Sequence, residues 1–254
     1  MIRLIASDLD GTLLQKDGML PPETFSVIKK LKEAGIIFCA ASGRQYANLK
    51  RLFFPVHQDM AFICENGSQV VMGNHLSVTP IPAHISGPLI QDILDAGMQL
   101  LLSTPETCIM LTNAARTFTD DIFYRLRNTC TMIDDYHTFL DEFIKISGFH
   151  PDGVSHLAPS LQKKWSSHLH ADIAGAKWLD FTMTNKADGI RALSGMLHID
   201  TQDMAAFGDQ FNDLSMLQSV GHPYLMESAP DALKAYGFSP CASVLDEIKG
   251  LFSL

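Results

Sequence analysis

The sequence predicts an α/β protein, in which a Rossmann-like, doubly wound parallel sheet forms the core and an α+β domain is inserted into it. Two observations support this fold class: strand-like apolar runs alternate with helical stretches near both ends of the chain, and the pattern changes between them. We expect residues 1–82 and 181–254 to form the core and residues 83–180 the insert. A chain of 254 residues is long enough for one large core with a second module.

In the first third of the chain, apolar runs alternate with helical stretches. The expected strands are residues 3–7, 36–41 and 60–64, and the expected helices lie near residues 23–34 and 46–53. Pro21 and Pro22 mark the start of the first helix, and Gly35 marks its end. Strand, helix and strand at this spacing form right-handed units, which build a parallel sheet.

The same alternation returns after the insert. There the expected helices are residues 186–197 and 212–218, and the expected strands are residues 204–207 and 221–226. Within the insert, the strand candidates are residues 99–103, 108–112, 143–147 and 179–183, with helices near residues 85–96 and 117–128. Trp165 and Trp178 of the insert are more typical of core packing than of ligand stacking, and His168 and His170 more typical of a solvated pair than of metal ligands.

The composition argues against nucleic acid or an anionic membrane as the main partner. The formal net charge is −9, and the only local group of basic residues is Lys29, Lys30 and Lys32, on one expected helix. The five cysteines are scattered, and neither a signal peptide nor a membrane span is recognisable, which favours a cytoplasmic location. A small molecule is the expected partner, and the oligomeric state stays open.

Polar residues follow several of the expected strands. Asp8 and Asp10 follow the first strand, and they can point the same way because side chains alternate along a strand. Gly11 then allows a sharp turn. Taken alone, this pattern is equally typical of a simple turn.

Three further positions show similar chemistry. Ser42 and Gly43 follow the second strand, where they can bind an anion or simply cap a helix. The late strand ends in GDQFND, with Asp209, Asn212 and Asp213. Lys186 is the first residue of an expected helix, where its charge opposes the helix dipole. Lys186 is therefore expected either to have a negative partner nearby or to be a solvated surface lysine.

The carboxyl ends of parallel strands meet at one edge of the sheet, so Asp8, Asp10, Asp209 and Asp213 are expected to converge. Two unit charges about 4 Å apart repel by roughly 4 kcal/mol at an effective dielectric constant near 20. The cluster therefore predicts a bound cation, and oxygen ligands favour Mg²⁺ or Mn²⁺ over zinc.

The order and spacing of DLDGT, Ser42, Lys186 and GDQFND resembles that of the haloacid dehalogenase (HAD) superfamily. The insert is similar to the C2 cap of its Cof-type phosphatases. The resemblance implies that Asp8 attacks phosphorus and that Asp10 protonates the leaving oxygen and later activates water. It also implies metal binding by Asp8, Asp209 and the backbone carbonyl of Asp10, with Asp213 binding through water or orienting the other ligands.

The resemblance further implies a phosphate site. Its expected members are Lys186, Ser42, Gly43, Asn212 and the backbone N–H groups of the turn Leu9, Asp10, Gly11 and Thr12. Thr12 is expected to hydrogen-bond within that turn. Arg44 is expected either to reach the substrate or to form a surface ion pair. Two departures from the family pattern, Ala187 and the pair Glu227 and Ser228, leave the core carboxylates untouched.

These features predict a Mg²⁺-dependent hydrolase that acts through an aspartyl phosphate. The substrate class is a small phosphorylated metabolite: a sugar phosphate, a nucleotide or a cofactor phosphate. A phosphotransferase or phosphomutase acting on sugar phosphates is one alternative, and a non-catalytic phosphosugar-binding protein is another. The insert is expected to close over the site and to select the leaving group.

Overall fold

Two sheets organise the chain in the computed structural model, which describes residues 1–120, 122–123 and 128–253. The chain divides into two units. The core unit comprises Met1–Arg44, Leu49–Ser77 and Asn185–Leu254, and the insert unit comprises Gln45–Asn48 and Val78–Thr184. The residues expected to form the insert, 83–180, fall within the second unit, which extends a few residues further at both ends.

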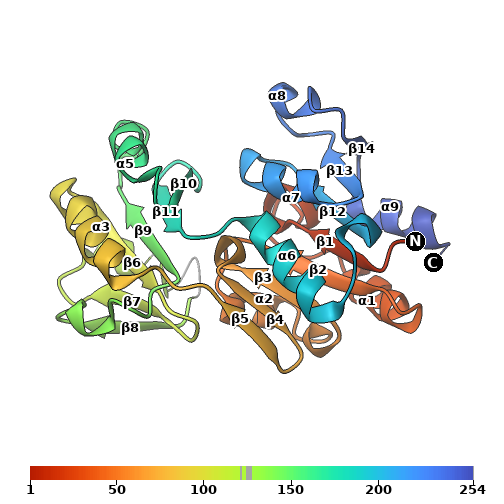
Figure 1. The fold of residues 1–254 in the computed structure, drawn as a ribbon, viewed down its shortest axis with the longest axis horizontal. Coiled ribbons are helices and arrows are strands. Elements are labelled where there is room, and N and C mark those ends of the chain that lie inside the picture. The colour runs from red at the N-terminus through yellow and green to blue at the C-terminus, as the bar shows by residue number, and fades with distance from the viewer. Residues whose placement is uncertain (121, 124–127, 254) are drawn as a thin grey trace. The chain divides into compact units, whose positions relative to one another are not determined.

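The core unit is built on an eight-stranded sheet in the order β14-β13-β12-β1-β2-β3-β4-β5 (Figure 1). Its strands are β1 (Leu4–Ser7), β2 (Ile37–Ala41), β3 (Ala61–Cys64), β4 (Gln69–Met72), β5 (His75–Val78), β12 (Met204–Gly208), β13 (His222–Met226) and β14 (Ser239–Cys241). β1 pairs in parallel with both β2 and β12. The predicted α/β class with a parallel sheet is therefore confirmed, and β4 adds an antiparallel neighbour to β3.

Helices cover both faces of this sheet. The helices are α1 (Thr24–Glu33), α2 (Tyr46–Leu52), α6 (Lys186–Leu197), α7 (Leu214–Ser219), α8 (Asp231–Lys234) and α9 (Val244–Phe252). On one face, Ala6 and Ile63 of the sheet share a core with Ile190 of α6 and Leu217 of α7. On the other face, Phe38 and Phe62 pack around Phe53, with ring centroids 6.4 and 6.2 Å apart. Strands buried on both faces explain why the sequence reads there as continuous apolar runs.

One expected helix of the core differs from prediction. Residues 212–218 were expected to form a single helix, but a short 3₁₀ turn, Phe211–Asp213, precedes α7. The Asp213 carboxylate accepts hydrogen bonds from the backbone N–H groups of Asp209 and Gln210 at 3.0 and 3.1 Å. These contacts hold the first residues of the expected helix in a tight loop at the end of β12.

The insert unit has a six-stranded sheet in the order β10-β11-β9-β6-β7-β8. Its strands are β6 (Gln99–Ser103), β7 (Cys108–Leu111), β8 (Cys130–Ile133), β9 (Lys145–Phe149), β10 (His170–Ile173) and β11 (Trp178–Thr182). Its helices are α3 (Ala83–Asp95), α4 (Arg116–Asp120) and α5 (Ala158–Trp165). α3 and α5 pack on one face of the sheet and complete an α+β domain.

Two expectations for the insert change, and one holds. The strand expected at residues 143–147 starts two residues later, since the carbonyl of Phe143 accepts from Ile81 at 2.7 Å instead of pairing within the sheet. Of the helix expected at residues 117–128, the first turn corresponds to α4. Residues 121 and 124–127 of the expected helix lie outside the described residues. Trp165 and Trp178 pack in the insert's apolar clusters, as expected.

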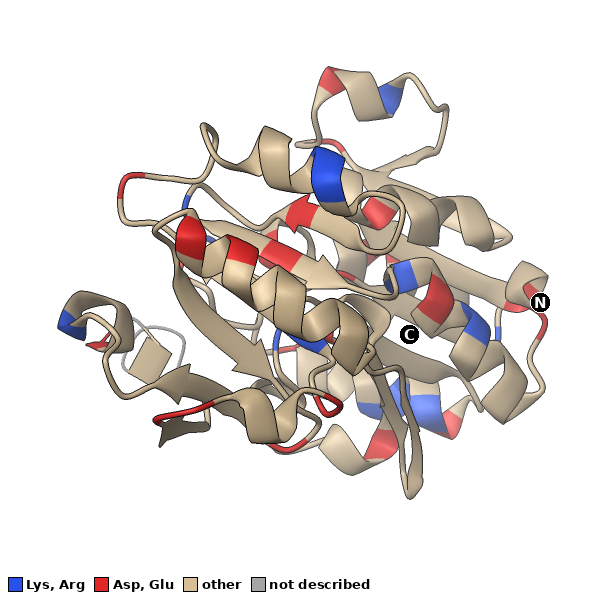
Figure 2. Cartoon of the chain, turned by 60° about the vertical axis from the view of Figure 1, so that its left-hand side comes forward, with Lys and Arg blue, Asp and Glu red and all other residues tan. Residues whose placement is uncertain are grey.

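Charged residues of both signs occur in several elements of the chain (Figure 2). In Figure 2 the Lys and Arg residues are spread over several helices, with Asp and Glu residues among them. Across the described part of the chain, no helix combines the length and the apolar character needed to cross a bilayer.

Candidate active site

The site lies at the carboxyl edge of the core sheet, where β1 and β12 end side by side. Ser7 of β1 aligns with Phe207 of β12, and the Asp8 N–H donates to the Phe207 carbonyl at 2.9 Å. This register places Asp8 beside the residues that follow β12. Two segments almost 200 residues apart in sequence are thereby joined at one point.

The turn after Asp8 requires glycine at position 11. Gly11 has φ +87°, and a Cβ atom there would lie 2.3 Å from Oδ2 of Asp209. The Thr12 hydroxyl donates to Oδ1 of Asp209 at 2.9 Å. The expectation that Thr12 bonds within its own turn is therefore wrong. The turn passes so close to Asp209 that this carboxylate is the acceptor nearest to the hydroxyl.

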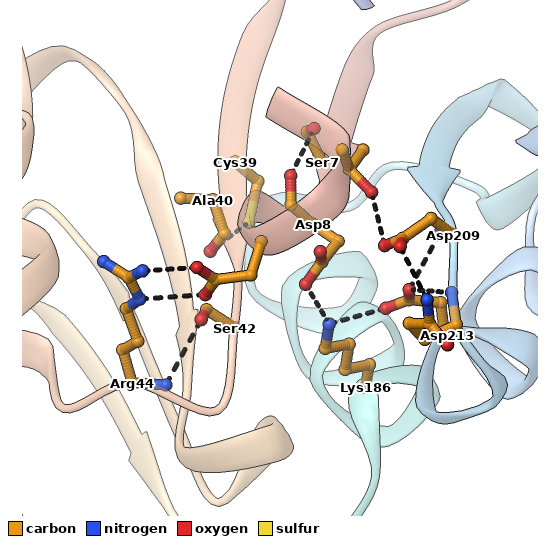
Figure 3. A network of polar contacts seen from close by, with 12 residues as sticks. Ser7, Asp8, Cys39, Ala40, Ser42, Arg44, Lys186, Asp209 and Asp213 are labelled. Atoms are coloured by element: carbon orange, nitrogen blue, oxygen red, sulfur yellow. Dashed lines mark hydrogen bonds and ion pairs between the residues drawn. The ribbon is translucent and has the colours of Figure 1, made fainter. Parts of the chain in front are cut away.

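Lys186 reaches the site from the first residue of α6. Asn185 caps this helix, because its side chain accepts from the backbone N–H groups of Ala187 and Asp188. The Lys186 side chain is 1 % exposed, and its Nζ donates to Asp8 and Asp213 at 2.5 Å each. Figure 3 shows the ammonium group between these two carboxylates. The negative partner expected for Lys186 is thus found, and Ala187 is accommodated within the first turn.

Asp213 serves both the lysine and the loop. One of its oxygens accepts from Lys186, and the other accepts from the backbone of Asp209 and Gln210. Asp213 is fully buried. It therefore holds Lys186 and the loop after β12 in a fixed relation to each other.

The charges of the site do not cancel. Three buried carboxylates, Asp8, Asp209 and Asp213, surround one buried ammonium, so the group carries two excess negative charges. Burial, together with repulsion from Asp213 and Asp209, raises the pKa of Asp8 to about 7 even though Lys186 opposes the shift. Burial also raises the pKa of Asp209. Burial alone would lower the pKa of Lys186, but Asp213 and Asp8 reverse this effect and raise it.

The donor set fits a divalent cation. One oxygen from each of Asp8, Asp209 and Asp213 lies within 4.8 Å of the others, and all three residues are buried. Carboxylate oxygens at the edge of a rigid sheet suit a hard divalent ion, whose charge would offset the excess. His168 and His170 are both exposed and do not belong to this group of described residues.

Asp10 does not join the cluster with its side chain. Its carboxylate is 64 % exposed and accepts from Arg44, with Nη2 at 2.5 Å and Nε at 3.0 Å (Figure 3). The expectation that Asp8 and Asp10 point the same way is wrong, because β1 ends at Ser7 and the chain turns before Asp10. Alternation along an extended strand no longer applies there. Arg44 forms the ion pair that was one of its two expected roles.

The other expected phosphate ligands differ in how exposed they are to a ligand. The Ser42 hydroxyl is buried and accepts from the Arg44 N–H at 3.2 Å, while the backbone at Gly43 is partly exposed. The side chain of Leu9 is buried, so only its backbone is available to a ligand. Asn212 is exposed in the turn after β12.

Three residues that support the site were not singled out from the sequence. Asn185 and Asp188 form a capping box that fixes the start of α6, and the spacing Asn-x-x-Asp was a usable signal for it. The Gln210 side chain donates to Oδ2 of Asp209 at 2.9 Å. No sequence pattern marks that contact, because it depends on the shape of the turn.

Comparisons with known proteins agree with this architecture. The chain is 30% identical over 258 residues to the 5-amino-6-(5-phospho-D-ribitylamino)uracil phosphatase YbjI of Escherichia coli K12. The alignment covers 92% of this chain and 88% of that protein. It is 26% identical to the HMP-PP phosphatase of Serratia proteamaculans, and that alignment covers 92% of this chain and 87% of the relative. A haloacid dehalogenase-like hydrolase from B. subtilis has a similar fold, with a TM-score of 0.83, 19% identity and 98% and 99% coverage.

A model of the haloacid dehalogenase-like hydrolase family matches residues 5–237. The match contains both ends of the acidic edge, Asp8 and Asp213, as well as the whole insert. It confirms the resemblance drawn from the DLDGT and GDQFND motifs. The chain therefore belongs to the haloacid dehalogenase-like hydrolases.

Proposed function

We propose that this protein hydrolyses phosphoric monoesters of small metabolites through an aspartyl phosphate, with Mg²⁺ as its cofactor. The observation that carries the proposal is the position of Asp8. It is buried at the carboxyl end of β1, within 2.5 Å of the Lys186 ammonium and beside two further carboxylates. A carboxylate held in this way by positive charge is a suitable nucleophile for phosphorus.

Each step assigns a role to residues of this chain. A carboxylate oxygen of Asp8 forms a bond to phosphorus, the ester P–O bond breaks, and the alcohol leaves with a proton from Asp10. Water then attacks the phosphoryl group and gives a proton to Asp10. This step breaks the bond between Asp8 and phosphorus, releases phosphate and restores the Asp8 carboxylate. The Asp10 side chain is exposed and can rotate from Arg44 towards the leaving oxygen.

Positive charge and N–H groups must stabilise the phosphoryl oxygens. Lys186 supplies a fixed ammonium, and the backbone at Gly43 and in the Leu9–Leu13 turn supplies N–H donors. Asp8, Asp209 and Asp213 would hold Mg²⁺, which supplies further positive charge to the phosphoryl oxygens. The carbonyl of Asp10 completes the proposed ligand set.

The relatives support a small phosphorylated metabolite as the substrate. Two of them are named as phosphatases of a phosphoribitylamino-uracil and of HMP-PP. Sugar phosphates, nucleotides and cofactor phosphates therefore form the set to screen. Phosphate released without an added acceptor separates a hydrolase from a phosphotransferase.

The test is the substitution Asp8→Asn, assayed with p-nitrophenyl phosphate and Mg²⁺. We expect hydrolysis to be lost, by at least about a thousandfold in kcat, because an amide does not form the aspartyl phosphate. Asp231→Asn is the matched control, since the Asp231 side chain is 99 % exposed on α8 and should leave the rate unchanged. Full activity of a folded Asp8→Asn variant would refute the proposed nucleophile.

A further inference from the structure

A third polar segment lies at the carboxyl end of the core sheet, after β3. Glu65, Asn66 and Gly67 follow Cys64 as a tight turn, and all three are buried. Connecting turns are usually exposed, because buried backbone polar groups need partners. The turn is therefore held in the interior by specific contacts.

The backbone of this turn is unusual for its sequence. The φ angles of Glu65, Asn66 and Gly67 are +47°, +55° and +101°. Positive φ at two consecutive residues other than glycine strains the backbone, and such strain clusters at functional sites. Asn is among the few residues that tolerate this conformation.

The turn connects the two parts of the site that carry the expected phosphate ligands. The Asn66 N–H donates to the Ser42 carbonyl, and the Glu65 N–H to the Arg44 carbonyl, both at 3.2 Å. On its other side, Gly67 packs against the helix start, since a Cβ there would lie 2.2 Å from the carbonyl of Asn185, the residue before Lys186. The turn thus lies between the Ser42–Arg44 segment and α6.

The Asn66 carboxamide faces Gly43. A Cβ on Gly43 would lie 3.0 Å from Oδ1 and 3.4 Å from Nδ2 of Asn66. Oδ1 is fully buried and has no hydrogen-bond donor among the described residues. A buried amide oxygen without a donor is destabilising, because it has lost its hydrogen bonds to water without replacing them. In this orientation of the amide the unused atom is an acceptor, and the turned amide would place a donor there instead. The position lies next to Gly43, a partly exposed residue of the Ser42–Arg44 segment.

We propose that Asn66 is a further substrate-contacting residue, whose carboxamide hydrogen-bonds to the phosphoryl group seated at Gly43. A half-turn about the last side-chain torsion exchanges Oδ1 and Nδ2, so Nδ2 can donate at the position next to Gly43. The substrate then receives donors from three strand ends: the turn after β1, the segment after β2 and Asn66 after β3. This inference rests on the proposed phosphatase function.

Two substitutions test the proposal without changing the backbone conformation. Asn66→Asp keeps the shape of the side chain and tolerates positive φ, but it replaces a donor with a negative charge. Asn66→Gly removes the carboxamide without strain. Asn74→Asp is the control, because Asn74 is exposed in the turn between β4 and β5 and receives the same charge.

The measurements are the inhibition constant of inorganic phosphate against p-nitrophenyl phosphate, kcat/KM and the melting temperature. For Asn66→Asp we expect the inhibition constant to rise at least about tenfold, because the new charge repels phosphate. For Asn66→Gly we expect a rise of about threefold to tenfold, and for Asn74→Asp less than twofold. A structural role alone would lower the melting temperature and leave the phosphate constant unchanged.

Either outcome is decisive. A folded Asn66→Asp protein whose phosphate constant stays within twofold of wild type overturns the proposal. If Asn66→Asp does not fold, Asn66→Gly decides by the same criterion. If the wild-type protein hydrolyses no ester, the proposed function fails instead, and calorimetric binding of inorganic phosphate to wild type and variants then decides the role of Asn66.

Discussion

At the residue scale, the site is defined by a lysine between two carboxylates. Lys186 keeps Asp8 and Asp213 close together without neutralising the group, because Asp209 lies beside them. Breaking a buried pair by removing one partner leaves an uncompensated charge, which typically costs 3–5 kcal/mol. The residues that hold Asp8, the proposed nucleophile, are therefore also expected to matter for stability.

The pair between Arg44 and Asp10 has the opposite character. Both side chains are partly exposed, at 33 % and 64 %, so Arg44→Met should change the free energy of unfolding by less than about 1 kcal/mol. Because Asp10 must leave the guanidinium to reach the leaving oxygen, the loss of Arg44 should keep kcat for p-nitrophenyl phosphate within about threefold of wild type. Urea unfolding and steady-state kinetics measure the two effects, and a fall in kcat of more than about tenfold would contradict this assignment.

The sequence identified most of the charged residues of the site but not their pairing. Asp8, Asp209 and Lys186 follow from strand ends and helix starts, which local patterns mark well. The contacts of Asp10 with Arg44 and of Thr12 with Asp209 depend on how the Leu9–Leu13 turn folds back. Local propensities do not predict how this turn folds, because the space at Gly11 is limited by Asp209, which lies 198 positions further along the chain.

At the element scale, α6 is the helix that positions the lysine, and its two glycines have different surroundings. A Cβ on Gly189 would lie 2.5 Å from the Ile63 side chain, whereas a Cβ on Gly195 would meet nothing within 4 Å. Gly195→Ala should therefore stabilise the protein by about 0.5–1 kcal/mol through helix propensity. Gly189→Ala should destabilise it by about 1–3 kcal/mol, because Ile63 is buried and must shift.

Chemical denaturation of the two alanine variants measures this contrast directly. Both substitutions change the same residue type in the same helix, so each serves as the control for the other. Equal effects of the two variants would show that α6 does not pack against β3 as described.

Strands with long apolar runs were predicted closely in both units, whereas several short elements and edge strands were missed in both. β1, β2, β3 and β12 lie within one residue of their expected bounds, because strands buried on both faces leave long apolar runs. β8 and β10 were missed because they are edge strands with mixed polar residues. β14 and α8 were missed because they are only three and four residues long. α9 was also missed, although it is a helix of nine residues.

At the scale of the whole molecule, the excess negative charge links stability to pH and to metal. In the unfolded chain Asp8 loses its proton near pH 3.8, whereas in the folded protein its pKa is about 7. Between these values the folded state binds more protons, so stability falls as the pH rises from about 4 to 7. A divalent cation, which binds the ionised form, should offset this loss.

We therefore expect the melting temperature in EDTA to decrease between pH 5 and pH 7.5. Added Mg²⁺ should raise it more at pH 7.5 than at pH 5, because protons compete with the metal for the carboxylates. Asp8→Asn is the control, since it removes the titrating group and should flatten the pH dependence. A melting temperature in EDTA that rises over this range, with the same slope in Asp8→Asn, would contradict the linkage.

The position of β1 between β2 and β12 has a consequence for biosynthesis. Strand β12 and Asp209 leave the ribosome some 200 residues after Asp8 has been made. Until then the nascent chain exposes the edge of β1 that pairs with β12, and Asp8, the proposed nucleophile, lacks Asp209 and Asp213 beside it. The proposed activity is therefore expected to be absent from any fragment that stops before the final fifth of the chain, however well the earlier strands have assembled.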